Sequence, residues 1–424
     1  MVRVITYVLV VLFGSSSWLS TNAIWMQLPY LTEQLPEGWS LPSYLAAVVQ
    51  IACIGPLIYS IIHKCTAYSF QTAPLILLLL VFCCICTALL AIFWSGTLFI
   101  FGSERSVYLI LLLFGMALVN STSNVLFMPY MSAYHVSYLT AYFVGMGVSS
   151  LFPSMVSLLQ GSGDGCVFIN GSYIKQYIPP RFDVSEYNFV MLFWMIIATI
   201  SFALLHWSPL GKEGSAKKVN KDMKVDLPVD ESSPLNRYAD MSVEDESADK
   251  ISPCQFRFLM FLTAVVNAQM NGIIPSIQSY AALPYSQATY HFALTLSHIV
   301  SPLICFLPLV VQPRRICSLS FLTMISSLFT SIIIILAKMS PTPFLHHSFY
   351  GSVLMVCISV GSSAIHSYLR TVFATVLQEA AKDSESQLFW CGVFTQIGSF
   401  LGSFTMFPLV NVFHIFQSAE SCPS

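Results

Sequence analysis

Several apolar stretches of this chain carry amide side chains next to aromatic rings. Amides both donate and accept hydrogen bonds, and indole rings offer a flat surface for stacking. Together they suit a flat heteroaromatic ligand with a hydrogen-bonding edge. Unpaired amides are costly in hydrocarbon, so these side chains must face each other or a wet cavity. The residues that we expect to line a binding site are Asn22, Trp25, Asn120, Asn124, Asn271, Gln278, His291 and Gln396.

The same amides also have an interpretation that needs no ligand. Hydrogen bonds between helices account for any one of them equally well. Asn120 and Asn124 are spaced i and i+4, so they share a helix face. His291 lies near the end of its stretch, where it could sense pH or bond to another helix. The sequence leaves both interpretations open.

Ionisable groups are scarce in these stretches. No Asp, Glu or Lys falls near the centre of any of them, and only His291, His298 and His366 remain. This argues against a carboxylate-based ion carrier and against an anionic substrate, because both need charge at membrane depth. The sequence also contains no catalytic signature, phosphate loop or metal-ligand spacing. We therefore expect a neutral solute, no enzyme activity, no metal and no cofactor.

The composition places these stretches in a membrane. Of the 424 residues, 56% are hydrophobic and 9% are charged, and the mean hydropathy is +0.72. Soluble domains contain about 25% charged residues, so a soluble enzyme is excluded. The net charge of −2 gives no reason to expect a nucleic-acid partner. The composition predicts an all-α polytopic membrane protein in a lipid bilayer.

A helix needs about 20 apolar residues to cross a bilayer. The first such run could be a secretory signal, but it exceeds the roughly 7–15 apolar residues of signal peptides, so we favour a retained helix. Eleven stretches are predicted to span: 4–26, 41–62, 73–95, 107–131, 137–160, 187–208, 256–278, 287–311, 315–337, 349–376 and 386–413.

The distribution of basic residues predicts the orientation. Fourteen of the 18 Lys and Arg residues fall on the side of the N-terminus, which is therefore predicted to be cytoplasmic, with the C-terminus extracellular. The sequon at Asn170 then lies outside, as a predicted glycosylation site. Cys166 and Cys422 also lie outside and could form a disulfide, although the sequence does not give their separation.

A polar insert and a weak repeat divide the chain. Residues 209–255 are rich in charged residues and Ser, which predicts a disordered cytoplasmic loop between a six-helix bundle (1–208) and a five-helix bundle (256–424). Asn22-Ala23-Ile24 recurs as Asn271-Gly272-Ile273 six spans later. This offset predicts a 6+5 parallel pseudo-repeat, the plan of carriers whose two bundles rock around a central site.

These residues resemble one family. The ten residues from Leu35 to Tyr44, LPEGWSLPSY, are highly specific, and the resemblance covers nearly the whole chain outside the insert. The chain is similar to the animal riboflavin transporters through these and the following motifs: Trp18, Asn22-Ala23-Ile24-Trp25, Leu28-Pro29, Ser123-Asn124-Val125, Phe127-Met128-Pro129, Asn271-Gly272, Ile277-Gln278-Ser279, Leu283-Pro284-Tyr285, Tyr290-His291, Gln396-Ile397-Gly398-Ser399 and Met406-Phe407-Pro408.

The resemblance implies sodium-independent riboflavin uptake at the plasma membrane. It also implies eleven spans and a fold similar to equilibrative nucleoside carriers and the major facilitator group. Vertebrate members carry an acidic residue where Gln27 stands, which leaves any pH dependence open. Two other functions are compatible with the residues alone, namely a carrier for nucleosides or other heterocycles and a receptor that does not transport.

Overall fold

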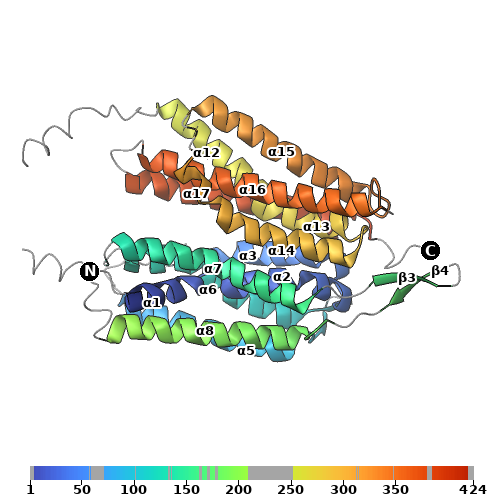
Figure 1. Cartoon of the computed structure of the whole chain (residues 1–424), viewed down its shortest axis with the longest axis horizontal. Helices are drawn as coiled ribbons and strands as arrows, with labels where there is room; N and C mark the ends of the chain where they lie inside the picture. Colours follow the sequence, from blue (N-terminus) through green and yellow to red (C-terminus); the bar gives the residue numbers. More distant parts are fainter. Residues whose placement is uncertain are drawn as a thin grey trace, which may run out of the picture.

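Helices make up most of the computed structural model (Figure 1). The strands among the described residues form two antiparallel hairpins, β1 (Leu98–Ile100) with β2 (Ser103–Arg105) and β3 (Gly165–Ile169) with β4 (Ser172–Gln176). The all-α prediction is confirmed. The structure describes residues 4–56, 58, 71–100, 102–131, 134, 136–161, 165–169, 172–176, 180–208, 252–311, 313, 315–346, 348–379 and 384–418.

Three predictions fall outside this part of the chain. The insert 209–255 is described only from residue 252 onward, and neither Asn170 nor Cys422 is described. The backbone of Cys166 lies in β3, but its side chain is not described. The disordered loop, the glycosylation site and the disulfide therefore stay predictions.

The helices follow the predicted stretches closely. The first half contains α1 (Val4–Ser15), α2 (Leu19–Gln34), η1 (Gly38–Ser40), α3 (Leu41–Ala52), α5 (Thr72–Phe93), α6 (Val107–Met131), α7 (Val136–Gln160) and α8 (Val184–Trp207). The second half contains α12 (Pro253–Ala268), η2 (Gln269–Ile273), α13 (Ile274–Ala282), α14 (Gln287–Ile304), η3 (Leu307–Leu309), α15 (Ile316–Lys338), α16 (Phe349–Glu379) and α17 (Ser384–Asn411).

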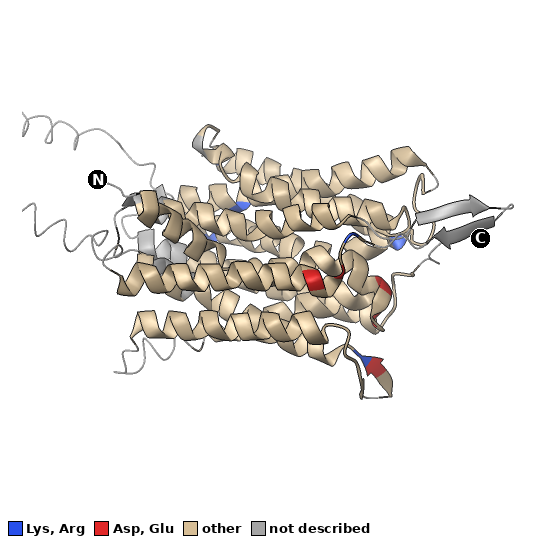
Figure 2. Ribbon diagram, turned by 60° about the horizontal axis from the view of Figure 1, so that its bottom comes forward, with Lys and Arg blue, Asp and Glu red and all other residues tan. Residues whose placement is uncertain are grey.

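The length and hydropathy of the helices bear on the number of spans. In the described part of the chain, eight helices are long and apolar enough to cross a membrane, and the bent pair α1–α2 makes a ninth. The apolar part of α6 is shorter, at Val107–Ser123. Every predicted stretch contains a helix, while the exact number of eleven stays a prediction. Figure 2 shows long stretches of helix free of charged residues, as a bilayer requires.

The first predicted span, 4–26, differs from the structure in shape and length. It is broken between α1 and α2 with a bend of 54°, and α2 continues to Gln34. Serine hydroxyls explain the break, since they compete with backbone N–H groups for carbonyls. Ser16 Oγ donates to Phe13 O at 2.6 Å and Ser17 Oγ to Gly14 O at 2.8 Å.

The predicted span 256–278 is also irregular. Residues Gln269–Ile273 form a π-helix, η2, between α12 and α13. The π-helix lies beside a close contact between α12 and α17. In this contact Gly398 and Gly402 of α17 lie against the backbone of α12. A Cβ on Gly402 would stand 2.4 Å from Ala268 O. The two glycines therefore let α17 pack closely against α12 inside the bundle.

Helices from the two halves of the sequence form two neighbouring groups, with α12–α17 above α1–α8 in Figure 1. We call the end that carries β3 and β4 the hairpin end, where α2, α7, α13 and α17 finish. There one hydrophobic core runs through both halves, with Leu28, Leu31 and Leu41 in the same cluster as Ile277 and Tyr280.

At the opposite end the second half has a core of its own. It is built from α12, α15, α16 and α17, with Leu259, Leu319, Phe373 and Cys391 among its members. No first-half residue belongs to this cluster among the described side chains. The two halves are thus joined by apolar packing at the hairpin end and have separate cores at the other.

Candidate functional site

Two predicted amides of the first half bind helices of that same half. Asn22 Nδ2 donates to Ser149 O of α7 at 3.2 Å. Asn120, which is fully buried, donates to Ser20 Oγ at 3.2 Å and to Thr21 Oγ1 at 2.6 Å. Both contacts join spans. Both amides therefore make hydrogen bonds between helices, which is one of the two interpretations that the sequence left open.

The remaining first-half candidates are only partly placed. Trp25 is half-buried and packs against the core that both halves share. The backbone of Asn124 lies in α6, but its side chain is outside the described part of the structure.

Asn271 makes comparable contacts within the second half. It lies in η2, and its Nδ2 donates to Ser399 Oγ of α17 at 3.0 Å and to Asn267 Oδ1 at 3.3 Å. Asn267 in turn donates to Thr395 Oγ1 at 3.4 Å. Asn22 and Asn271 therefore each tie an irregular span to a helix of their own half.

The two predicted glutamines lie at different depths. Gln278 is buried in α13 near the hairpin end, and Gln396 is half-buried in α17. The structure brings neither into a hydrogen bond with another predicted residue, among the bonds described.

His291 lies where the two halves meet. Its Nε2 is 3.2 Å from Ser157 O and 3.0 Å from Ser157 Oγ, which joins α14 to α7. Because a carbonyl only accepts, Nε2 carries the proton in this contact. Further along the same two helices, Ser150 Oγ donates to His298 O at 3.4 Å. We call this contact between α7 and α14 the α7–α14 seam.

The α7–α14 seam buries polar atoms without partners. His291 Nδ1 and Thr295 Oγ1 have no hydrogen-bond partner in the described structure, although both residues are at most 1% exposed. Their i, i+4 spacing puts them on one face of α14. The sequence analysis missed Thr295, and this spacing from His291 was the available signal.

A second polar cluster lies beside η2. Gln269 Nε2 donates to Ser327 Oγ at 2.8 Å, and Gln269 Oε1 lies 3.0 Å from Nε2 of the fully buried His366. His366 Nδ1 is 2.6 Å from Ser362 O. The cluster joins α15 and α16 to η2, and of its members the sequence had singled out His366.

The hairpin end carries further contacts between the halves. Ser279 Oγ donates to Trp39 O at 2.7 Å, and the rings of Trp39 and Tyr280 pack edge to face with centroids 5.9 Å apart. Gln287 Nε2 donates to Pro29 O. Any passage between the halves is closed at this end.

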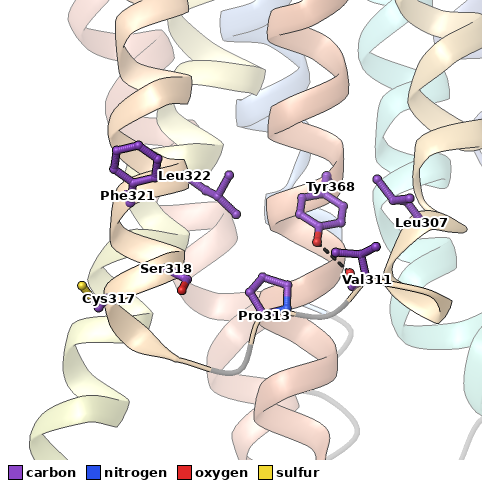
Figure 3. Close-up of a pocket in the computed structure, with 8 residues that line it drawn as sticks. All are labelled: Leu307, Val311, Pro313, Cys317, Ser318, Phe321, Leu322 and Tyr368. Carbon is purple, nitrogen blue, oxygen red and sulfur yellow. Dashed lines mark hydrogen bonds between the residues drawn. The ribbon is translucent and has the colours of Figure 1, made fainter.

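One hollow lies away from all of these contacts. It is an open groove of about 620 Å³ at the end opposite the hairpins, between η3, α15 and α16, and none of the predicted residues lines it (Figure 3). Its lining is almost entirely apolar, and Tyr368 donates across it to Val311 O at 2.7 Å. Such a groove suits lipid chains better than a hydrogen-bonding solute.

Comparison with known proteins decides the family. The family model described as solute carrier family 52, riboflavin transporter, matches residues 2–418. The chain belongs to this family. It is 46% identical to riboflavin transporter rft-1 of Caenorhabditis elegans, over 98% of both chains. It is 32% identical to solute carrier family 52, riboflavin transporter, member 3 of Homo sapiens, again over 98% of both.

Solved structures give the fold of this solute carrier. A D-xylose-proton symporter matches with a TM-score of 0.58 at 11% identity, covering 97% of this chain and 92% of the symporter. A bacterial homologue of the lysosomal transporter Spinster matches with a TM-score of 0.54 at 14% identity, covering 94% and 80%. The predicted family and the likeness to major facilitator carriers are confirmed, and this family 52 member is a transporter rather than an enzyme.

Proposed function

We propose that this protein carries riboflavin into cells across the plasma membrane. Family membership and the names of the relatives support this substrate. The chemistry of the predicted residues fits it, since riboflavin offers an uncharged ring to stack and an edge with donors and acceptors for amides. A path without charged groups suits a neutral vitamin.

Transport proceeds by alternating access between the bundles 1–208 and 256–424 of a 6+5 arrangement. The distribution of hydrophobic cores supports this mechanism. The two halves share one hydrophobic cluster at the hairpin end and have separate hydrophobic clusters at the opposite end. We place the N-terminus in the cytoplasm and the C-terminus outside, and the contacts between the halves at the hairpin end then support a carrier closed to the outside. Opening must break the contacts at the hairpin end while the opposite ends approach.

The substrate site lies between the halves and involves the eight predicted residues. Among them Asn22, Trp25, Asn271 and Gln396 are half-buried, so a solute can reach them. Asn22 and Asn271 then exchange a bond within their bundle for one to riboflavin. Asn120 is fully buried and supports the broken first span from behind.

Labelled riboflavin uptake in expressing cells tests the function. We expect saturable uptake that is unchanged when sodium is replaced and that excess unlabelled riboflavin suppresses more strongly than excess nucleoside does. Measurements at two external pH values determine whether protons contribute. Vesicles containing the pure protein that bind riboflavin but accumulate none would contradict transport.

Variants test the site. Asn22→Ala and Asn271→Ala should each weaken uptake about tenfold at equal surface amount, since a lost hydrogen bond to a buried amide costs about 1–3 kcal/mol. Thr263→Ala serves as a control, because Thr263 Oγ1 donates to Leu259 O of its own helix and Thr263 is not among the predicted site residues. Unchanged concentration dependence in both asparagine variants would remove them from the site.

A further inference from the structure

A buried carboxylate lies at the corner between α2 and α3. Glu37 is 8% exposed, and both of its oxygens accept hydrogen bonds from a single residue at the start of α6. Ser106 N donates to Oε1 at 2.8 Å and Ser106 Oγ to Oε2 at 2.6 Å. Hydrogen bonds to an ionised acceptor are about twice as strong as neutral ones. We call this contact the Glu37–Ser106 brace.

The corner next to Glu37 touches the second half at three places in succession. Trp39 contacts α13, as described above, through its carbonyl and its ring. Ser43 Oγ accepts from Asn411 Nδ2 of α17 at 2.7 Å. The ring of Tyr44 packs edge to face on Phe407 with centroids 5.1 Å apart.

A second bond holds the same corner to the first half. Arg105 Nη1 donates to Tyr44 OH at 3.0 Å, and its guanidinium lies 5.3 Å from the centre of the Tyr44 ring. Arg105 ends β2 and Ser106 directly precedes α6, so both bonds fix the corner to the segment that leads into α6. The corner is therefore fastened to α6 by charged groups and touches α13 and α17 through neutral ones.

We propose that residues 37–44 are the gate at the hairpin end and that Glu37 is its positioning residue. The brace makes the corner move with the first half as a rigid part. When the halves separate, the neutral contacts to α13 and α17 break together while the charged ones stay. This proposal deepens the proposed function by naming the part of the chain that closes the outer side. It rests on the proposed function only for the uptake measurement; the labelling measurement does not depend on the substrate.

The central test measures how often the gate opens. Thr295→Cys places a near-isosteric thiol at the buried α7–α14 seam, and a membrane-impermeant thiol reagent is applied to intact cells expressing the full chain. The same cells without the Thr295→Cys change give the background from native cysteines. Adding Glu37→Gln, which replaces one acceptor oxygen by an NH2 group, should raise the labelling rate about tenfold, because a hydrogen bond to a charge is lost.

Glu104→Gln is the matched control. Glu104 is an exposed carboxylate two residues from Ser106, and it accepts only from Thr97 Oγ1 among the described contacts, at 2.5 Å. The same change of charge there should leave the labelling rate unaltered. Ser106→Ala should act like Glu37→Gln, and the double variant should be no faster than either, because both remove one interaction.

Uptake supplies the second measurement. A gate that closes poorly should lower the maximal rate about tenfold without raising the KM for external riboflavin, whereas loss of folded protein would lower the surface amount instead. Faster labelling in Glu37→Gln, with Glu104→Gln unchanged, supports the gate even in a chain that transports another solute. Labelling that is unchanged or slower in both Glu37→Gln and Ser106→Ala would overturn it.

Discussion

Thr295 Oγ1 at the α7–α14 seam is a buried hydroxyl with no hydrogen-bond partner among the described residues. A buried polar atom without a partner costs about 1–3 kcal/mol. If the seam opens as proposed, Thr295 would meet water or solute, so its unpaired hydroxyl would disfavour the closed arrangement. The seam is held shut by other contacts despite this cost.

Replacing Thr295 by valine should stabilise the closed seam. The change removes the unpaired hydroxyl and keeps the branched shape, so we expect the melting temperature in detergent to rise and the uptake rate to fall several-fold. Thr263→Val is the control, because its hydroxyl already bonds within α12. A lower melting temperature for Thr295→Val would show that its hydroxyl has a partner, such as a buried water.

Gln27 offers a test of pH dependence. It is 1% exposed, and its Nε2 donates to Gln160 Oε1 at 2.8 Å. A carboxylate placed there must lose its charge or find a cationic partner. We therefore expect Gln27→Glu to transport well at acidic external pH, where the neutral acid resembles the amide, and poorly at alkaline pH. A flat profile from pH 5.5 to 8 would contradict this.

Among the described elements, α12 and α17 pack backbone to backbone at a glycine. A Cβ on Gly402 would stand 2.4 Å from Ala268 O, which is backbone and cannot yield. Gly402→Ala should therefore force the helices apart and cost about 1–3 kcal/mol. Gly392→Ala on the same helix meets nothing within 4 Å and should be neutral or slightly stabilising. Thermal unfolding in detergent measures both, and equal melting temperatures would refute the contact.

The helices were predictable because apolar stretches of bilayer length are a strong signal. The irregular parts of the helices, by contrast, were not predictable from the sequence. The break at Ser16 and Ser17 and the π-helix at Gln269–Ile273 depend on which carbonyl each side chain reaches, and composition does not encode this. The same limit applies to the site. The sequence showed that Asn22 and Asn271 need partners, while only the fold shows Ser149 and Ser399 in that role.

At the scale of the whole molecule, an engineered disulfide should hold the two halves together. Ser43 and Asn411 contact each other at the hairpin end, so a Ser43→Cys, Asn411→Cys pair should form a disulfide under mild oxidation. The lock should abolish uptake, and a reducing agent should restore it, while each single variant stays active. Full uptake with the disulfide formed, as seen by altered gel mobility, would rule out movement at this end.

The shared core at the hairpin end has a thermal consequence. Separating the halves there would transfer apolar side chains such as Trp39 and Tyr280 into water, and this would raise the heat capacity of the open form. The free-energy difference between the closed and the open form is then a curved function of temperature. Cooling weakens the apolar attraction that holds the halves together at the hairpin end. An Arrhenius plot of uptake should accordingly bend, even in a membrane whose lipids undergo no phase change.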